Sequence, residues 1–231
     1  MAKLNDQHLG TLRGALGPQV FKMLFGEAYV ARLPRRTLNE PSAETIERRN
    51  RFKLCMKFSK AVYGLTKVRP FWDAFIPEGV SKRLPTIAKI AKTSYQSITA
   101  ADVQDTTFLA PDFGFVVTTT DVTIDGTEIS VAIDPLGTNQ GFDTGVEKYI
   151  QLGCVMHLQD PVSGTLTSHR FMNFASSNVI LNLANPLSFT IPIEPAKQAI
   201  YDAYDTHKTF LIFVTLDANG KSVHYSSTFT A

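Results

Sequence analysis

The hydrophobic pattern of this chain changes its period near residue 106, and this change constrains the fold more than any other feature. Apolar side chains recur at helical spacing in residues 42–65, whereas Ile129, Val131 and Ile133 occupy every second position. A period of 3.6 residues is typical of an amphipathic helix, and a period of two is typical of a half-buried strand. The sequence therefore predicts helices first and β-structure afterwards.

We expect an α+β protein with three segments. Residues 1–40 form a basic, Gly-rich arm that ends in a β-hairpin, residues 41–105 form a helical region, and residues 106–231 form an antiparallel Ig-like β-sandwich. A chain of 231 residues, 44% of them hydrophobic, is long and apolar enough to bury a substantial core.

The hairpin in the arm is predicted from two short apolar and basic runs. Residues 19–24 (QVFKML) and 29–34 (YVARLP) lie on either side of Phe25-Gly26-Glu27. An isolated two-stranded hairpin is marginally stable in water. We therefore expect this hairpin to dock on its own domain or on a neighbouring chain.

The strongest helix signal begins at Ser42 and runs to about Leu65. Ser42 is a suitable N-cap, and Glu44 and Glu47 place negative charge in the first turns. On a helical wheel, a broad apolar face lies opposite a narrow basic sector. The apolar face consists of Leu54, Cys55, Phe58, Ala61, Val62 and Leu65. The basic sector, called here the basic ridge, consists of Arg49, Lys53, Lys57 and Lys60.

An aromatic cluster follows the helix. Residues 67–70 end the helix, and Phe71, Trp72 and Phe75 come next. We expect these rings to lie where the helices pack on the sandwich.

The second half of the chain predicts six to eight short strands at sandwich-like spacing. Asp125-Gly126 indicates a hairpin turn, and residues 195–204 indicate a short helix that crosses between sheets. The acidic residues around the turn are expected to serve turn geometry rather than a cation. They are Asp121, Asp125, Glu128 and Asp134.

Charge is divided unevenly between the two halves. Residues 1–100 carry 18 Lys and Arg against 7 Asp and Glu, whereas residues 101–231 carry 5 against 14. Three explanations account for the excess of basic residues in the first half. They are a helix face exposed to solvent, contact with nucleic-acid phosphates, and contact with an acidic protein surface. The acidic second half favours the protein partner, because a nucleic-acid site gains nothing from nearby negative charge.

The sequence contains no pattern that indicates catalysis or a cofactor. The five histidines lack metal-ligand spacing, and phosphate-loop, dinucleotide-binding and nucleophile motifs are missing. Cys55 and Cys154 are expected to be buried reduced thiols. No apolar run reaches the roughly 18 residues that a bilayer span requires, and no signal peptide is predicted. We expect a soluble protein without enzyme activity, metal or cofactor.

Both ends of the chain resemble a family of structural proteins encoded by Bacteroidetes and by their phages and prophages. The resemblance lies in the Gly-rich start, in the run from Tyr29 to Pro34, in the helix with Arg49 and Phe52, and in the final hairpin around Asn219-Gly220. That family often has Trp in the first hairpin, where this chain has Leu24-Phe25. The resemblance implies a virion or prophage structural component with no enzyme activity and no cofactor.

These observations predict a phage virion structural protein of the head, neck or tail, assembled in the host cytoplasm. Its partners would be copies of itself, as a homo-oligomer, and neighbouring virion proteins, with no membrane. The alternative is a nucleic-acid-contacting virion or regulatory protein that uses the same basic face. A carbohydrate-binding sandwich rests on fold analogy alone, and a hydrolase is the weakest interpretation.

We expect the assembly interface to combine basic and aromatic side chains. The predicted interface residues are Phe21, Tyr29, Arg32, Arg35, Arg36, Arg49, Lys53, Lys57 and Lys60. Most of the association energy is expected to come from five aromatic side chains, those of Phe21, Tyr29, Phe52, Phe58 and Trp72.

Overall fold

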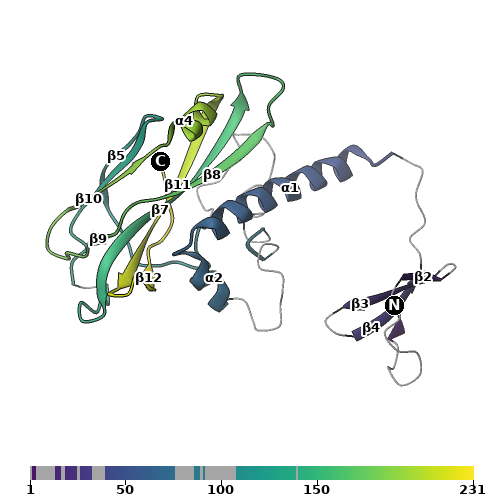
Figure 1. Ribbon diagram of the computed structural model, residues 1–231, viewed down its shortest axis with the longest axis horizontal. Helices are drawn as coiled ribbons and strands as arrows, with labels where there is room; N and C mark the ends of the chain where they lie inside the picture. The colour runs from purple at the N-terminus through teal and green to yellow at the C-terminus, as the bar shows by residue number, and fades with distance from the viewer. Residues whose placement is uncertain are drawn as a thin grey trace. The chain divides into compact units, whose positions relative to one another are not determined.

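The chain divides into two compact units, residues 1–43 and 44–231. A computed structural model describes residues 2–3, 14–16, 19–24, 27–32, 40–75, 86–88, 91, 108–138 and 140–231. The elements of both units are drawn in Figure 1. Helices in the first part of the second unit precede mostly antiparallel sheets, which confirms the predicted α+β class.

The N-terminal unit contains a four-stranded antiparallel sheet in the order β1-β4-β3-β2. Its strands are β1 (Ala2–Lys3), β2 (Gly14–Leu16), β3 (Gln19–Leu24) and β4 (Glu27–Arg32). The predicted hairpin is confirmed, since Gln19 pairs with Arg32 and Leu24 pairs with Glu27. The sequence did not reveal β1 and β2, because segments of two and three residues are too short to show a period.

The second unit has three layers. One layer is a three-stranded sheet in the order β10-β6-β5, and the central layer is a six-stranded sheet in the order β12-β11-β7-β8, with β9 on β7 and β13 on β11. The outer sheet consists of β5 (Thr119–Ile124), β6 (Glu128–Ile133) and β10 (Leu187–Pro192). The central sheet consists of β7 (Glu147–Pro161), β8 (His169–Ala175), β9 (Val179–Ile180), β11 (Tyr204–Asp217), β12 (Ser222–Tyr225) and β13 (Phe229–Thr230).

The long strands β7 and β11 pair along almost their whole length and are buried on both faces. Cys154 and Met156 on β7, with Phe213 on β11, face the outer sheet. Val155 on β7 and Ile212 on β11 face the helices instead. Because side chains alternate along a strand, this one pair of strands contributes to two separate cores.

Helix α1 (Ala43–Gly64) covers the other face of the central sheet, as Figure 1 shows. It begins directly after Ser42 and ends next to Leu65, as predicted. Its buried residues belong to the predicted apolar face and start at Leu54. Phe58 packs edge-on against Phe171 and Phe210, with ring centroids 5.8 and 5.9 Å away. The second half of α1 therefore anchors the helix to the sheet.

Helix α2 (Arg69–Phe75) carries the predicted aromatic cluster. Trp72 is fully buried, and its indole N–H donates to the carbonyl oxygen of Leu109 at 2.7 Å. Trp72 belongs to the core shared by the helices and the central sheet. The expected packing of this cluster against the sandwich is confirmed for Trp72, whereas Phe75 is half exposed.

Two predicted connections are also confirmed. Helix α4 (Pro195–Tyr201) links β10 of the outer sheet to β11 of the central sheet. At the β5–β6 turn, Gly126 has a φ of +86°, and the Asp125 carboxylate accepts hydrogen bonds from the backbone N–H groups of Thr127 and Glu128. Hydrogen bonds from Thr127 and then Glu128 lower the pKa of Asp125. The Asp125 carboxylate therefore stabilises the turn, as predicted.

Phe58 and Phe52 on α1 provide a matched test of the helix-to-sheet core. Phe58 is fully buried and Phe52 is 54% exposed. We expect Phe58→Ala to lower the free energy of unfolding by about 3–5 kcal/mol and Phe52→Ala to change it by less than about 0.5 kcal/mol. Urea unfolding measures both values, and equal effects would contradict this placement of α1.

Candidate functional site

The basic ridge lies on the solvent side of α1. Arg49, Lys53, Lys57 and Lys60 are all exposed. Their spacing of three or four residues places them along one side of the helix, away from the buried Leu54 and Phe58.

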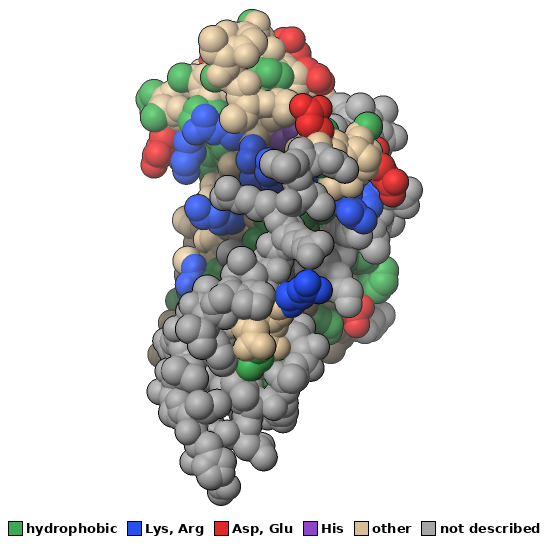
Figure 2. All heavy atoms as spheres, turned by 90° about the vertical axis from the view of Figure 1, so that its right-hand side faces the viewer, with side chains coloured by type: hydrophobic (Ala, Val, Ile, Leu, Met, Phe, Trp, Pro, Cys, Tyr) green, Lys and Arg blue, Asp and Glu red, His purple; other side chains and the backbone are tan. Residues whose placement is uncertain are grey.

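A groove runs between this ridge and the first residues of β8. Its larger part has a volume of about 530 Å³, and a smaller hollow of about 220 Å³ adjoins it at Lys57 and His169. Four basic side chains line this basic groove, namely those of Lys53, Lys57, Lys60 and Arg170, together with the imidazole of His169. Among the described residues that line it, none is Asp or Glu. In Figure 2, Lys and Arg side chains gather near a histidine on one face of the molecule.

Two hydrogen bonds hold the walls of the basic groove together. The Lys57 ammonium donates to the carbonyl oxygen of His169 at 3.1 Å. The Asn173 amide donates to the carbonyl oxygen of Ala61, also at 3.1 Å. Both bonds join α1 to β8, so the spacing between the two walls is fixed by the fold.

A buried histidine lies next to this groove, on the helix-facing side of β7. His157 is fully buried and stacks on Phe171, with ring centroids 4.3 Å apart. Its Nδ1 lies 3.2 Å from the amide nitrogen of Gln159, and its Nε2 lies 3.2 Å from Nδ1 of His169. Because the amide nitrogen can only donate, His157 carries its proton on Nε2 and donates to His169.

Burial is the main cause that lowers the pKa of His157, to about 3. Electrostatic interactions with His169 on β8, Lys208 on β11 and Lys57 on α1 lower it further. His157 therefore stays neutral at pH 7, and the positive charge of the basic groove comes from the lysines and Arg170.

The structure brings together only part of the predicted interface. Lys53, Lys57 and Lys60 line the basic groove, and Arg49 lies on the same helix beside Lys53 and Phe52. The remaining predicted residues belong to the other unit or lie beyond the described ranges. Arg32 is exposed on β4, Tyr29 is half-buried on β4, Phe21 lies on β3, and Arg35 and Arg36 lie outside the described residues.

Two aromatic predictions about the interface are wrong. Phe58 and Trp72 were expected to be among the residues that supply most of the association energy, but both are fully buried in the core of their own unit. Conversely, His169 and Arg170 were not predicted as neighbours of the basic ridge. Arg170 is one of only five basic residues in the acidic half of the chain. A rare basic residue in this half could have been recognised as a candidate site residue.

The described residues show no further reactive centre. Cys55 and Cys154 are buried free thiols, as predicted, and burial raises the pKa of Cys154. In the described ranges, no group of three His, Cys, Asp or Glu side chains lies close enough to hold a metal ion. Among the helices described there, none has the length and apolar character to cross a membrane.

Comparison of the sequence with protein-family models and with curated proteins gives no match. We therefore infer the function from the residues of the site itself.

The neutral state of His157 predicts a specific loss of stability in acid. Below about pH 6.5 the unfolded chain protonates this imidazole, whereas the folded chain resists protonation down to about pH 3. In that window, we expect this residue to make the free energy of unfolding fall by up to about 1.4 kcal/mol for each pH unit of acidification. His157→Asn should show a smaller slope in urea unfolding between pH 4 and about 6.5. Parallel curves for the two proteins would contradict a buried neutral His157.

Proposed function

We propose that the protein is a non-enzymatic structural component of a phage virion that assembles through the basic ridge and the basic groove. The observation that carries this proposal is the convergence of Lys53, Lys57, Lys60 and Arg170 on one groove whose described lining holds no acidic side chain. Such a surface attracts an acidic partner and fixes its orientation.

Another copy of the same chain can supply that acidic surface. Exposed carboxylates occur on and around the outer sheet of the sandwich, which is the layer farthest from α1. They belong to Asp121, Asp125, Glu128 and Asp134. Basic and acidic surfaces on opposite layers of one unit favour head-to-tail contacts, which produce rings or filaments.

Exposed apolar side chains beside the basic ridge support the same proposal. Phe52 is 54% exposed and Ile46 is 46% exposed on the first half of α1, where the helix has no buried residue. Burial of such side chains against a partner would supply the association energy, while the charges would set the register. The resemblance to phage structural proteins points to the same class of function.

The alternative partner is a nucleic acid. Lysines and an arginine that line a groove without carboxylates also suit phosphate groups. The two alternatives can be distinguished by experiment. If the partner is another copy of the chain, a salt-sensitive complex forms without nucleic acid, whereas the alternative requires DNA or RNA.

The test is the mass of the protein in solution, measured by light scattering at low and high salt, with and without duplex DNA. We compare the wild type with the triple variant Arg49→Gln/Lys53→Gln/Lys60→Gln, in which Lys57 is kept because it bonds to His169. We expect the triple variant to raise the apparent Kd of self-association about tenfold at low salt, at about 0.5 kcal/mol for each exposed ion pair. The difference should shrink at high salt.

The matched control is Lys148→Gln/Lys197→Gln/Lys221→Gln, which removes the same number of charges from the sandwich. The control should assemble like the wild type. Equal weakening by both variants would contradict a specific role of the basic ridge. A protein that stays monomeric and binds DNA in a salt-dependent manner would replace the proposal with the nucleic-acid alternative.

A further inference from the structure

The basic groove lies at the β8 edge of the central sheet, and a second surface lies at the opposite edge, next to β12. There, α2, residues 113–116 and β12 enclose a pocket of about 570 Å³. Rings dominate its lining, with Phe71, Phe113, Phe115, Phe142 and Tyr225. Its volume lies within the range of small-ligand sites. This aromatic pocket is separate from the basic groove, because β12 and β8 are the two outer strands of the path β12-β11-β7-β8.

The backbone around Gly114 shapes one wall of the pocket. The N–H of Phe115 donates to the carbonyl oxygen of Tyr225, and the N–H of Ser227 donates to the carbonyl oxygen of Phe115. A Cβ atom at residue 114 would overlap the carbonyl oxygen of Tyr225, so only glycine allows the segment to approach β12 this closely. The rings stay open to solvent, since Phe113 is 73% exposed.

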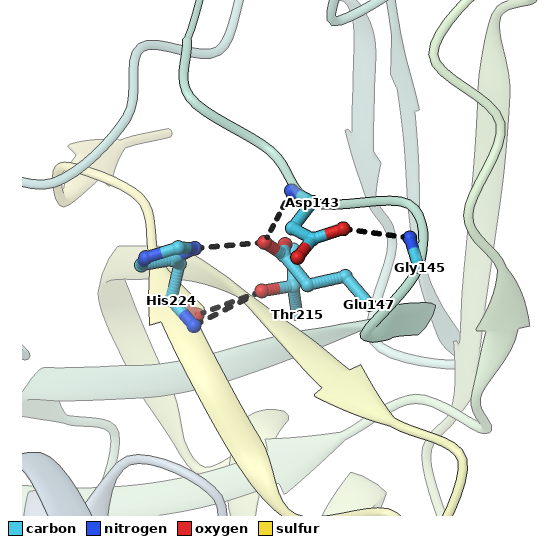
Figure 3. Close-up of polar contacts among 5 residues, drawn as sticks. All are labelled: Asp143, Gly145, Glu147, Thr215 and His224. Carbon is cyan, nitrogen blue, oxygen red and sulfur yellow. Dashed lines mark hydrogen bonds and ion pairs between the residues drawn. The ribbon is translucent and has the colours of Figure 1, made fainter.

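One polar group points to a specific kind of ligand. The side chain of His224 lines the aromatic pocket and is 55% exposed, while its Nδ1 lies 2.9 Å from Oε1 of the fully buried Glu147. Figure 3 shows this pair, with Asp143 on the far side of the carboxylate. Thr215 also holds the backbone of His224, because its hydroxyl oxygen accepts from the His224 N–H at 3.0 Å. His224 is therefore fixed through both its backbone and its ring.

The hydrogen bonds determine which nitrogen of His224 is available to a ligand. The backbone N–H of Asp143 donates to Oε1 of Glu147 at 3.1 Å, so this oxygen acts as an acceptor. The proton between Glu147 and His224 then belongs to Nδ1 of the imidazole. In the neutral ring, Nε2 is left as an acceptor, and Figure 3 shows it directed away from Glu147.

We infer that the aromatic pocket binds a tyrosine side chain of a partner polypeptide, whose phenol O–H donates to Nε2 of His224. Aromatic walls accept the ring by stacked or edge-on packing, as Phe71 and Tyr225 already pack on each other at 4.6 Å. An acceptor with a fixed position at the wall selects a ring that carries a donor. Tyrosine is also among the residues enriched as anchors in protein interfaces. This inference does not depend on the proposed function, because it uses a different surface.

The test compares N-acetyl-tyrosinamide with N-acetyl-phenylalaninamide, which differ only in the phenol oxygen. Binding to the full chain is followed by amide chemical shifts at pH 8. We expect the tyrosine compound to bind about threefold to tenfold more tightly, as one added hydrogen bond implies. Shift changes should centre on Phe115, Val116 and Val223, which line the pocket.

Two variants separate the role of His224 from general effects. In His224→Leu the preference for tyrosine should fall to about one, because the acceptor is lost while the aromatic walls remain. In His207→Leu, which changes a histidine that packs on Tyr201, the preference should persist. If His224→Leu does not fold, N-acetyl-O-methyl-tyrosinamide tests the same hydrogen bond on the wild type and should bind no better than the phenylalanine compound.

The inference is overturned by equal affinity for the two compounds, by a preference that survives in His224→Leu, or by the absence of saturable binding. Tight binding of the O-methyl compound would also overturn it, because that compound lacks the donor.

Discussion

The pairing of β7 with β11 is the contact on which the other layers of the second unit depend. Each strand sends alternate side chains into the sandwich core and into the helix-facing core. A slip of one residue in this pairing would move Val155 into the sandwich and Met156 under α1, exchanging two sets of side chains at once. Because both cores must be filled by the matching set of side chains, only one register of the β7–β11 pairing is stable. It also explains why α1 has a defined place on the sheet, although only the second half of the helix is buried.

The two edges of this central sheet carry surfaces of different chemistry. At the β8 edge, lysines of α1 and Arg170 form a positively charged groove beside a histidine that remains neutral. At the β12 edge, aromatic rings surround an imidazole whose tautomer is set by the buried Glu147. In both places a histidine is held by a polar neighbour from β7, namely Gln159 or Glu147. The same strand that fixes the cores thus also positions the polar groups of both surfaces.

Local patterns predicted local structure well in this chain. The capping and periodicity around Ser42 defined α1, the Asp125-Gly126 pair defined the turn, and residues 195–204 indicated the helix between sheets. What the sequence could not reveal were contacts between distant segments. His169 meets His157 and Lys57 only because β8 pairs with β7 beneath α1, and Glu147 meets His224 across 77 positions of the chain. Phe58 and Trp72 were misassigned to an interface because an apolar helix face looks the same whether it packs on its own sheet or on a neighbour.

The burial of the only tryptophan has a practical consequence. Trp72 lies in the core between the helices and the central sheet, with its indole bonded to Leu109, and no tryptophan lies in the sandwich core. Its intrinsic fluorescence is therefore an optical reporter of the helical layer alone. Loosening of α1 and α2 would expose the indole to water and shift its emission to longer wavelength, even if the two sheets stayed together. Emission and far-ultraviolet circular dichroism, followed together, would distinguish detachment of the helices from unfolding of the whole unit.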